Sequence, residues 1–120
     1  MLRSLGFMEA IATHVSATKV HELDGSGMID SSVEVASAAL AKDSNINVIY
    51  GINDGSALGG LQAWRAAGLA EGDLIVAGTG SEGLAFLNEM TKPGTPYLVE
   101  AAMFPEGVGY TGMNLAVDLF

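Results

Sequence analysis

The sequence contains no cysteine, few basic residues and no long apolar run, and each of these absences removes a class of function. Without cysteine the chain forms no disulfide, no thiolate zinc site and no thiol nucleophile. Five lysines and arginines stand against 14 aspartates and glutamates, which gives a formal net charge of -9. Nucleic acids and anionic membranes both require a basic patch, so this balance argues against either as a partner. No apolar run approaches the roughly 18 residues of a membrane span.

The composition indicates one folded domain. Hydrophobic residues make up 49% of the 120 residues and charged residues 16%, which is typical of a chain with a core. No linker or low-complexity segment divides it, so we expect a single domain over residues 1–120. No signal peptide opens the chain, because Met1-Leu2-Arg3 leads straight into a short amphipathic segment. As given, the chain is expected to remain in the cytoplasm.

Residues 46–63 carry the best-marked local pattern. The apolar run at residues 48–50, the polar turn at residues 51–55 and apolar residues at helical spacing beyond it predict a strand, a loop and a helix. We expect Asp54 to be the N-cap of this helix, since its carboxylate can accept amide hydrogens of the first turn. Ligands of open α/β sheets bind outside the carboxyl ends of the strands, where Asn53 and Asp54 would lie.

Helices and strands are predicted to alternate along the rest of the chain. Apolar spacing and cap residues predict helices over residues 2–15, from a Ser31 capping box to Lys42, from Asp54 to Gly68, from an N-cap at Ser81 to Pro93, and from Pro105 onward. Short apolar or alternating runs predict strands at residues 19–23, 46–50, 74–77 and 97–102. Strands alternating with helices indicate a parallel sheet covered on both faces. We therefore expect an α/β, three-layer αβα domain with about four mostly parallel strands.

Three patterns that could support enzyme chemistry are incomplete. Residues 78–83, GTGSEG, lie between a strand and a helix, but they lack the lysine of a phosphate loop, and Glu82 would repel a phosphate. Ser56 and Ser81 stand outside the Gly-x-Ser-x-Gly pattern of hydrolases. The acidic residues are scattered without the spacing of a metal site. We therefore expect no enzymatic activity, no catalytic residue, no cofactor and no bound metal.

Asn53 has the best case for contacting a ligand. Its side-chain amide offers both a donor and acceptors, which suits the vicinal hydroxyls of a sugar. The neighbouring Asp54 has two interpretations that the sequence leaves open, a ligand contact or a helix cap alone. Trp64 falls within the predicted helix and is interpreted as a packing residue.

Several segments, in order, match one known pattern. They are residues 46–60, 66–68 and 75–80, the first helix with Arg3, Gly6-Phe7 and Glu9-Ala10, and residues 99–105 continuing to Gly109 and Gly112. Together they resemble the C-terminal lobe of type I periplasmic sugar-binding proteins of ABC transporters, the ribose-binding group, over nearly the whole chain. The sugar-responsive core of LacI-type repressors shares this lobe. The resemblance implies a Rossmann-like or flavodoxin-like lobe, a small-molecule sugar as ligand, a periplasmic location, and ABC transporter membrane subunits as partners.

The resemblance also implies a set of ligand-binding residues. In the family pattern Asn53 is a sugar ligand. An acidic ligand is expected in the loop after the next strand, where Gly80 stands with Glu82 nearby. A polar ligand is expected just before the Phe-Pro pair, where Met103 stands. With Asp54, these residues form the expected ligand-binding site.

The family pattern further implies that this chain is an incomplete lobe. The family closes two lobes over its sugar, and one strand of its C-terminal sheet lies between the strands equivalent to residues 19–23 and 46–50. A vacancy there would leave backbone groups unpaired. We expect either that these two strands pair directly or that an oligomer fills the gap, with a homodimer or a missing N-terminal lobe as partner. The expected function is weak or oligomer-dependent carbohydrate binding, and the alternative is a folded, oligomerising fragment that binds no ligand.

Overall fold

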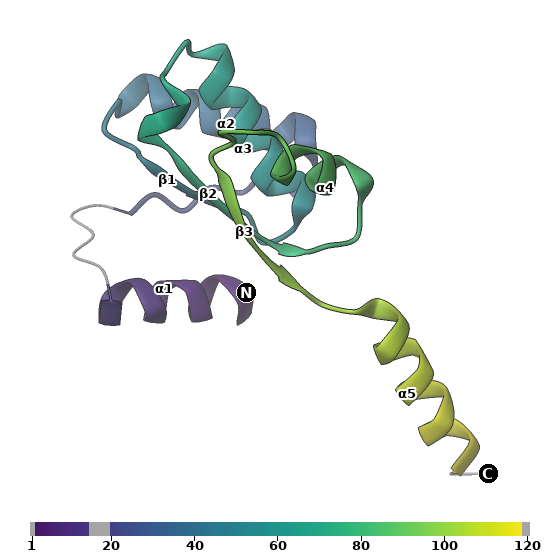
Figure 1. The fold of residues 1–120 in the computed structure, drawn as a ribbon. Coiled ribbons are helices and arrows are strands. Elements are labelled where there is room, and N and C mark those ends of the chain that lie inside the picture. Colours follow the sequence, from purple (N-terminus) through teal and green to yellow (C-terminus); the bar gives the residue numbers. More distant parts are fainter. Residues whose placement is uncertain (1, 15–19, 119–120) are drawn as a thin grey trace.

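The computed structural model describes residues 2–14 and 20–118, which form an α/β fold (Figure 1). The three described strands form one parallel sheet of order β1-β2-β3. With five described α-helices, this arrangement is compatible with the expected three-layer αβα architecture. The elements are α1 (Leu2–His14), α2 (Ile29–Lys42), β1 (Val48–Tyr50), α3 (Asp54–Ala66), the 3-10 helix η1 (Glu71–Asp73), β2 (Ile75–Gly80), α4 (Leu84–Met90), β3 (Tyr97–Ala102) and α5 (Pro105–Asp118).

The described part of the sheet has one strand fewer than the sequence suggested. Residues 20–23 belong to no helix or strand, and Lys19 lies outside the described residues. Val20 and Leu23 are 45% and 50% exposed, and their separation of three residues does not give the two-residue period that buries one face of a strand. A cavity separates residues 23–27 from β1. In the described part of the sheet β1 pairs with β2 alone, so the expected direct pairing of residues 20–23 with β1 is not found.

The hydrophobic core lies where α3 packs against the sheet. Leu61 of α3 and Val76 of β2 are completely buried. Two glycines allow α3 to approach its neighbours closely. A Cβ on Gly59 would lie 2.6 Å from the carbonyl oxygen of Ile29 in α2, and a Cβ on Gly60 would lie 2.6 Å from Cγ2 of Ile49 in β1. Helix α3 is therefore wedged between α2 and the sheet, which fixes the position of its N-terminus.

Two helices do not begin where the sequence suggested. Helix α2 begins at Ile29, and Ser31 lies within its first turn, where the hydroxyl donates a hydrogen bond to the Gly25 carbonyl. The expected capping box is therefore wrong. Helix α4 begins at Leu84, and the expected N-cap Ser81 stands in the preceding loop with a positive φ of 63°. Neither serine occupies the N-cap position, which is taken by Met28 in α2 and by Gly83 in α4.

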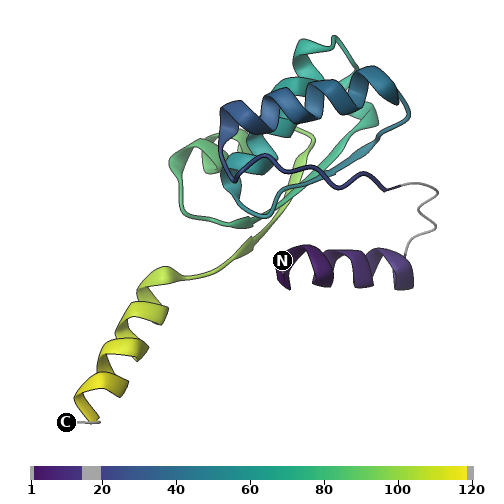
Figure 2. The same cartoon turned by 180° about the vertical axis from the view of Figure 1, so that it is seen from behind.

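The two sides of the sheet are covered unequally. Helices α2, α3 and α4 lie together on one side, with α2 beside α3 (Figures 1 and 2). Helix α1 covers the other side of the sheet only near the carboxyl end of β1, where the ring of Phe7 stacks on Tyr50 with centroids 4.1 Å apart. Helix α5 leads away from the end of β3 in both views. Much of the second side of the sheet is thus left exposed.

Candidate functional site

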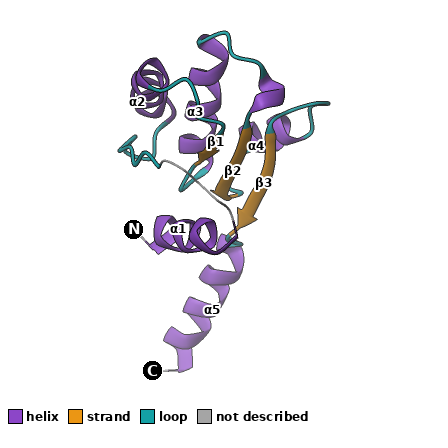
Figure 3. Cartoon of the chain, turned by 90° about the vertical axis from the view of Figure 1, so that its left-hand side faces the viewer, coloured by secondary structure: helices purple, strands orange, loops and turns teal. Residues whose placement is uncertain are grey.

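The carboxyl ends of the three strands meet at one edge of the sheet, close to α1 and the start of α5 (Figure 3). Asn53 and Asp54 follow β1, Gly80 ends β2, and Glu82 lies in the loop beyond it. Met103 follows β3, and its N–H donates to the Gly80 carbonyl at 3.1 Å. All five residues selected from the sequence therefore gather here. We call this edge the carboxyl-end rim.

Asn53, rather than Asp54, caps helix α3. The Asn53 backbone is extended, with φ of -155° and ψ of 171°, as an N-cap requires, whereas Asp54 is already helical. The Asn53 Oδ1 accepts the N–H of Ser56 at 2.8 Å, and the Asn53 Nδ2 donates to the Gly27 carbonyl at 2.9 Å. The expectation of an Asp54 cap is therefore wrong by one residue. Beyond these two bonds, the Asn53 amide retains one hydrogen and one acceptor lone pair.

The carboxylate of Asp54 binds the loop that follows β2. Its Oδ1 accepts the N–H of Ser81 at 2.9 Å, and its Oδ2 accepts those of Glu82 at 3.0 Å and Gly83 at 2.9 Å. Successive amides of this kind are what an anion-binding loop offers to a ligand. Here a side chain of the same chain occupies them. Asp54 thus fastens the β1–α3 connection to the β2–α4 connection.

Gly80 is required by the position of Asp54. Its φ is 146°, and a Cβ built on it would lie 2.5 Å from Oδ1 of Asp54. An acidic side chain at this position would therefore displace the Asp54 carboxylate. Glu82, the nearby candidate for the acidic ligand, is exposed.

Two residues of β3 that were not predicted from the sequence, Glu100 and Tyr97, are connected to the loop of the rim by hydrogen bonds. Oε1 of Glu100 accepts the N–H of Ser81 at 3.1 Å, and the Tyr97 hydroxyl donates to Oε2 of Glu100 at 2.5 Å. Burial raises the pKa of Glu100, and the nearby Asp54 carboxylate raises it further, against the lowering effect of the Tyr97 hydrogen bond. Burial also raises the pKa of Tyr97. The available signal was that Glu100 is the one charged residue in an otherwise apolar strand sequence, YLVEAA.

A cavity of about 320 Å³ lies beside the rim, between residues 23–27 and β1. Ile52, which precedes Asn53, lines it, and so do Gly27 and Ser56, to both of which Asn53 is bonded. This volume is at the lower end of the range for small-molecule sites. The polar side chains on its walls are those of Asp24, Ser26, Ser32, Tyr50 and Ser56, and the larger apolar ones are those of Leu23, Val35, Ile49 and Ile52.

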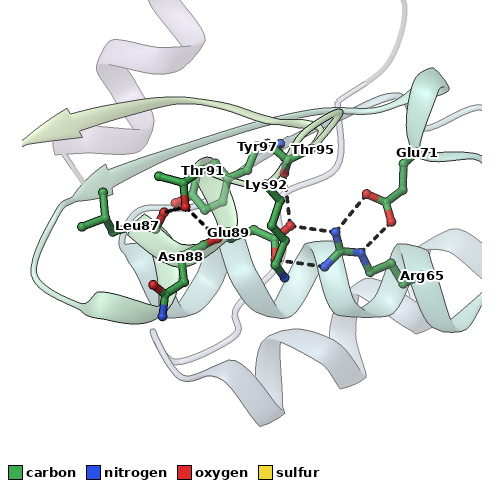
Figure 4. A network of polar contacts seen from close by, with 9 residues as sticks. All are labelled: Arg65, Glu71, Leu87, Asn88, Glu89, Thr91, Lys92, Thr95 and Tyr97. Carbon is green, nitrogen blue, oxygen red and sulfur yellow. Dashed lines mark hydrogen bonds and ion pairs between the residues drawn. The ribbon is translucent and has the colours of Figure 1, made fainter.

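The opposite end of the sheet carries a network of ion pairs (Figure 4). Arg65 of α3 contacts Glu71 at 2.8 Å and Glu89 at 2.7 Å. Glu89 is only 5% exposed, and Lys92 and Thr95 also donate to its carboxylate. The Arg65 hydrogen bond, together with those of Lys92 and Thr95, lowers the pKa of Glu89 to about 2 against the effect of burial. Because both Glu89 oxygens are engaged, the network joins α3, η1 and α4 and leaves this carboxylate no vacant position for a ligand.

The chemistry available at the rim is that of amide, hydroxyl and carboxylate groups. Within the ranges that the structure describes, no three potential metal-ligating side chains gather, and no helix combines the length and apolarity needed to cross a membrane. Groups of the kind found at the rim bind polar organic ligands through directional hydrogen bonds. No protein-family model and no curated protein matches this chain.

Proposed function

We propose that this chain is a carbohydrate-binding lobe related to the C-terminal lobe of the periplasmic sugar-binding proteins of ABC transporters. The observation that carries the proposal is the cavity of about 320 Å³ beside the carboxyl-end rim. In open α/β sheets this is the end at which ligands bind. The finer fold assignment, a Rossmann-like or flavodoxin-like lobe, is part of the proposal. The parallel order β1-β2-β3, with α3 and α4 between successive strands, supports it.

The walls of the cavity suit a small sugar. The hydroxyls of Ser26 and Ser56 can each donate and accept, as sugar hydroxyls do. Ile49 supplies an apolar surface for the C–H groups of the sugar ring. Asn53 does not itself line the cavity, but it is bonded to Gly27 and Ser56, which do, and it has one amide hydrogen and one lone pair uncommitted. A pentose or a hexose is the class of ligand that this combination favours.

The proposed affinity is low. A single lobe covers one side of a sugar, whereas tight small-molecule sites bury most of the ligand surface. Binding is therefore proposed to be weak, or to depend on an oligomer or on a second, N-terminal lobe. By family resemblance, a periplasmic location and membrane subunits of an ABC transporter as partners belong to the same proposal.

Thermal unfolding in the presence of a panel of pentoses and hexoses tests this function. A sugar that binds only the folded state must raise the melting temperature. Ser56→Ala should reduce that shift, because the serine hydroxyl lines the cavity. Ser37→Ala, at an exposed position of α2, is the matched control and should leave the shift unchanged. A melting temperature that does not change with any of the sugars at high concentration would overturn the proposal.

A second candidate function is favoured by the way the rim uses its own polar groups. Both oxygens of Asp54 are bonded to loop amides, and the Asn53 amide already uses one hydrogen and one lone pair in bonds within the chain. This pattern fits a folded, oligomerising unit that binds no sugar. A stable oligomer whose melting temperature does not change with any sugar would support this alternative over carbohydrate binding.

A further inference from the structure

Helix α5 exposes apolar side chains that a stable helix would normally bury. Every side chain from Glu106 to Val117 is exposed, and Tyr110 and Leu115 are 72% and 59% exposed. An isolated helix of this length is marginal in water. The radius of gyration is 16.2 Å, against about 14 Å for a compact domain of the same length. Helix α5 therefore needs a surface to pack against.

The same chain offers an uncovered surface of matching character. We call it the open face, and it consists of the side chains opposite to α3 on the sheet. The register places Val48 beside Ile75 and Ala77 beside Val99, so these side chains form adjacent rows. Ile75 and Val99 are 48% and 56% exposed. Tyr50 and Thr79 share this side of the sheet, and Phe7 of α1 stacks on Tyr50, so the open face is limited to Val48, Ile75, Ala77, Val99 and Ala101.

We propose that two copies of this chain exchange α5, so that the helix of each copy packs on the open face of the other. Such a reciprocal contact is closed by a two-fold axis and leaves no further unpaired surface of the same kind. Charge favours these two surfaces over others. Each copy carries a net charge of -9, which makes copies repel one another. The open face has no charged residue, and α5 has none between Glu106 and Asp118.

The connection between β3 and α5 favours exchange over folding back onto the same chain. Only Met103 and Phe104 separate the two elements, and Phe104 has a left-handed φ of 47°. That conformation is strained for a residue with a side chain, and Pro105 further restricts its neighbour. Helix α5 already points away from its own sheet (Figures 1 and 3). Short strained hinges of this kind promote the exchange of elements between copies.

The size of the contact predicts a weak dimer. A helix of this length covers about 20 Å by 10 Å, or on the order of 200 Å² per contact surface. Reciprocal exchange joins four such surfaces, about 800 Å² in all, which is below the usual size of a stable interface. We therefore expect a dimer that dissociates on dilution through the micromolar range. This proposal goes beyond carbohydrate binding and does not depend on it.

Sedimentation velocity over a range of protein concentrations tests the exchange. Val99→Lys on the open face and Leu115→Lys on α5 should each raise the dissociation constant of the dimer about tenfold or more, equivalent to about 1.4 kcal/mol. Leu84→Lys, at a position of α4 that is 77% exposed, is the matched control and should leave the dimer intact. Circular dichroism verifies that each variant is folded. A chain that stays monomeric throughout, or a dimer that both variants leave unchanged, would overturn the proposal.

Cysteine cross-linking separates exchange between copies from folding back within one copy. The chain has no cysteine of its own, so Val99→Cys and Leu115→Cys can be introduced singly. Mixed and oxidised, the two variants should form a disulfide-linked dimer containing one of each. A double variant carrying both cysteines in one chain provides the comparison. If it forms an intrachain disulfide while the mixture forms no linked dimer, α5 packs on its own sheet and the exchange is contradicted.

Discussion

A Cβ on Gly80 would lie 2.5 Å from Oδ1 of Asp54, so the Asp54 carboxylate fits here because residue 80 has no side chain. The carboxylate accepts hydrogen bonds from three successive amides, those of residues 81–83. Because Asp54 also opens α3, the contact joins two strand–helix connections that are far apart in the sequence. The shape of the carboxyl-end rim depends on this pair.

Removal of the Asp54 carboxylate should loosen the rim. Asp54→Ala leaves three amides without their acceptor, and because the loop is partly exposed, water replaces some of the lost bonds. We expect the free energy of unfolding to fall by about 2 kcal/mol. Urea denaturation measures it, with Glu34→Ala, an exposed carboxylate of α2, as the control. Equal effects of the two substitutions would mean that the Asp54 bonds contribute little.

A side chain at Gly80 should be costly. Gly80→Ala places a Cβ against Asp54 in a backbone conformation that residues with side chains rarely adopt. We expect a loss of about 1–3 kcal/mol in unfolding free energy. At Gly72 a Cβ would meet nothing within 4 Å, so Gly72→Ala is the matched control and should change stability little. If both variants unfold at the same urea concentration, the close approach at Gly80 is not a constraint.

Neutralising Glu100 should stabilise the chain at neutral pH. A carboxyl group with a raised pKa contributes stability below its unfolded pKa and loses it as pH rises through its folded pKa. Glu100→Gln removes this loss while keeping an oxygen for the Ser81 amide. We expect the variant to be more stable than the parent at pH 7 and similar to it at pH 3. If the parent is more stable than Glu100→Gln at pH 7, burial does not raise the pKa of Glu100 as described.

Glu89 should have the opposite pH dependence. Its pKa is lowered to about 2 from an ordinary 4.5, so its contribution is present above 4.5 and is lost as pH falls toward 2. Glu89→Gln should lower stability at pH 7 by up to about 3 kcal/mol, because it breaks a buried ion pair. Glu71→Gln removes the more exposed partner of Arg65 and should cost less. Urea titrations of parent and variants from pH 7 to pH 2 follow these losses.

Local patterns were sufficient to predict most of the elements. The β1–α3 unit, the parallel sheet, and the end of α3 before Gly68, which has a φ of 70°, follow from periodicity and turn chemistry. Trp64 is a packing residue as interpreted, being 3% exposed with its indole N–H bonded to the Ala70 carbonyl. These features depend on neighbours close in the sequence, which is why a single sequence contains them.

Contacts between residues far apart in the sequence could not be predicted from local patterns. Asp54 and Asn53 are adjacent and both are good cap residues, and only the contact with Gly27 and the loop after β2 decides which one caps α3. Residues 20–23 have apolar positions, but in the described part of the chain they form no ladder with β1. Glu100 is marked by its apolar neighbours, yet its bond to Tyr97 depends on the irregularity in the β2–β3 register between Val76 and Ala77, which lets two residues three positions apart face the same side.

The most direct test of the proposed function is a two-dimensional amide NMR titration of the chain with the sugar that shifts its melting temperature most. Carbohydrate binding in the proposed cavity predicts saturable shifts for Ser26, Asn53 and Ser56, with Arg65 at the far end of the sheet unaffected. Spectra that do not change with any pentose or hexose, or changes centred near Arg65, would contradict a carbohydrate site at the carboxyl-end rim.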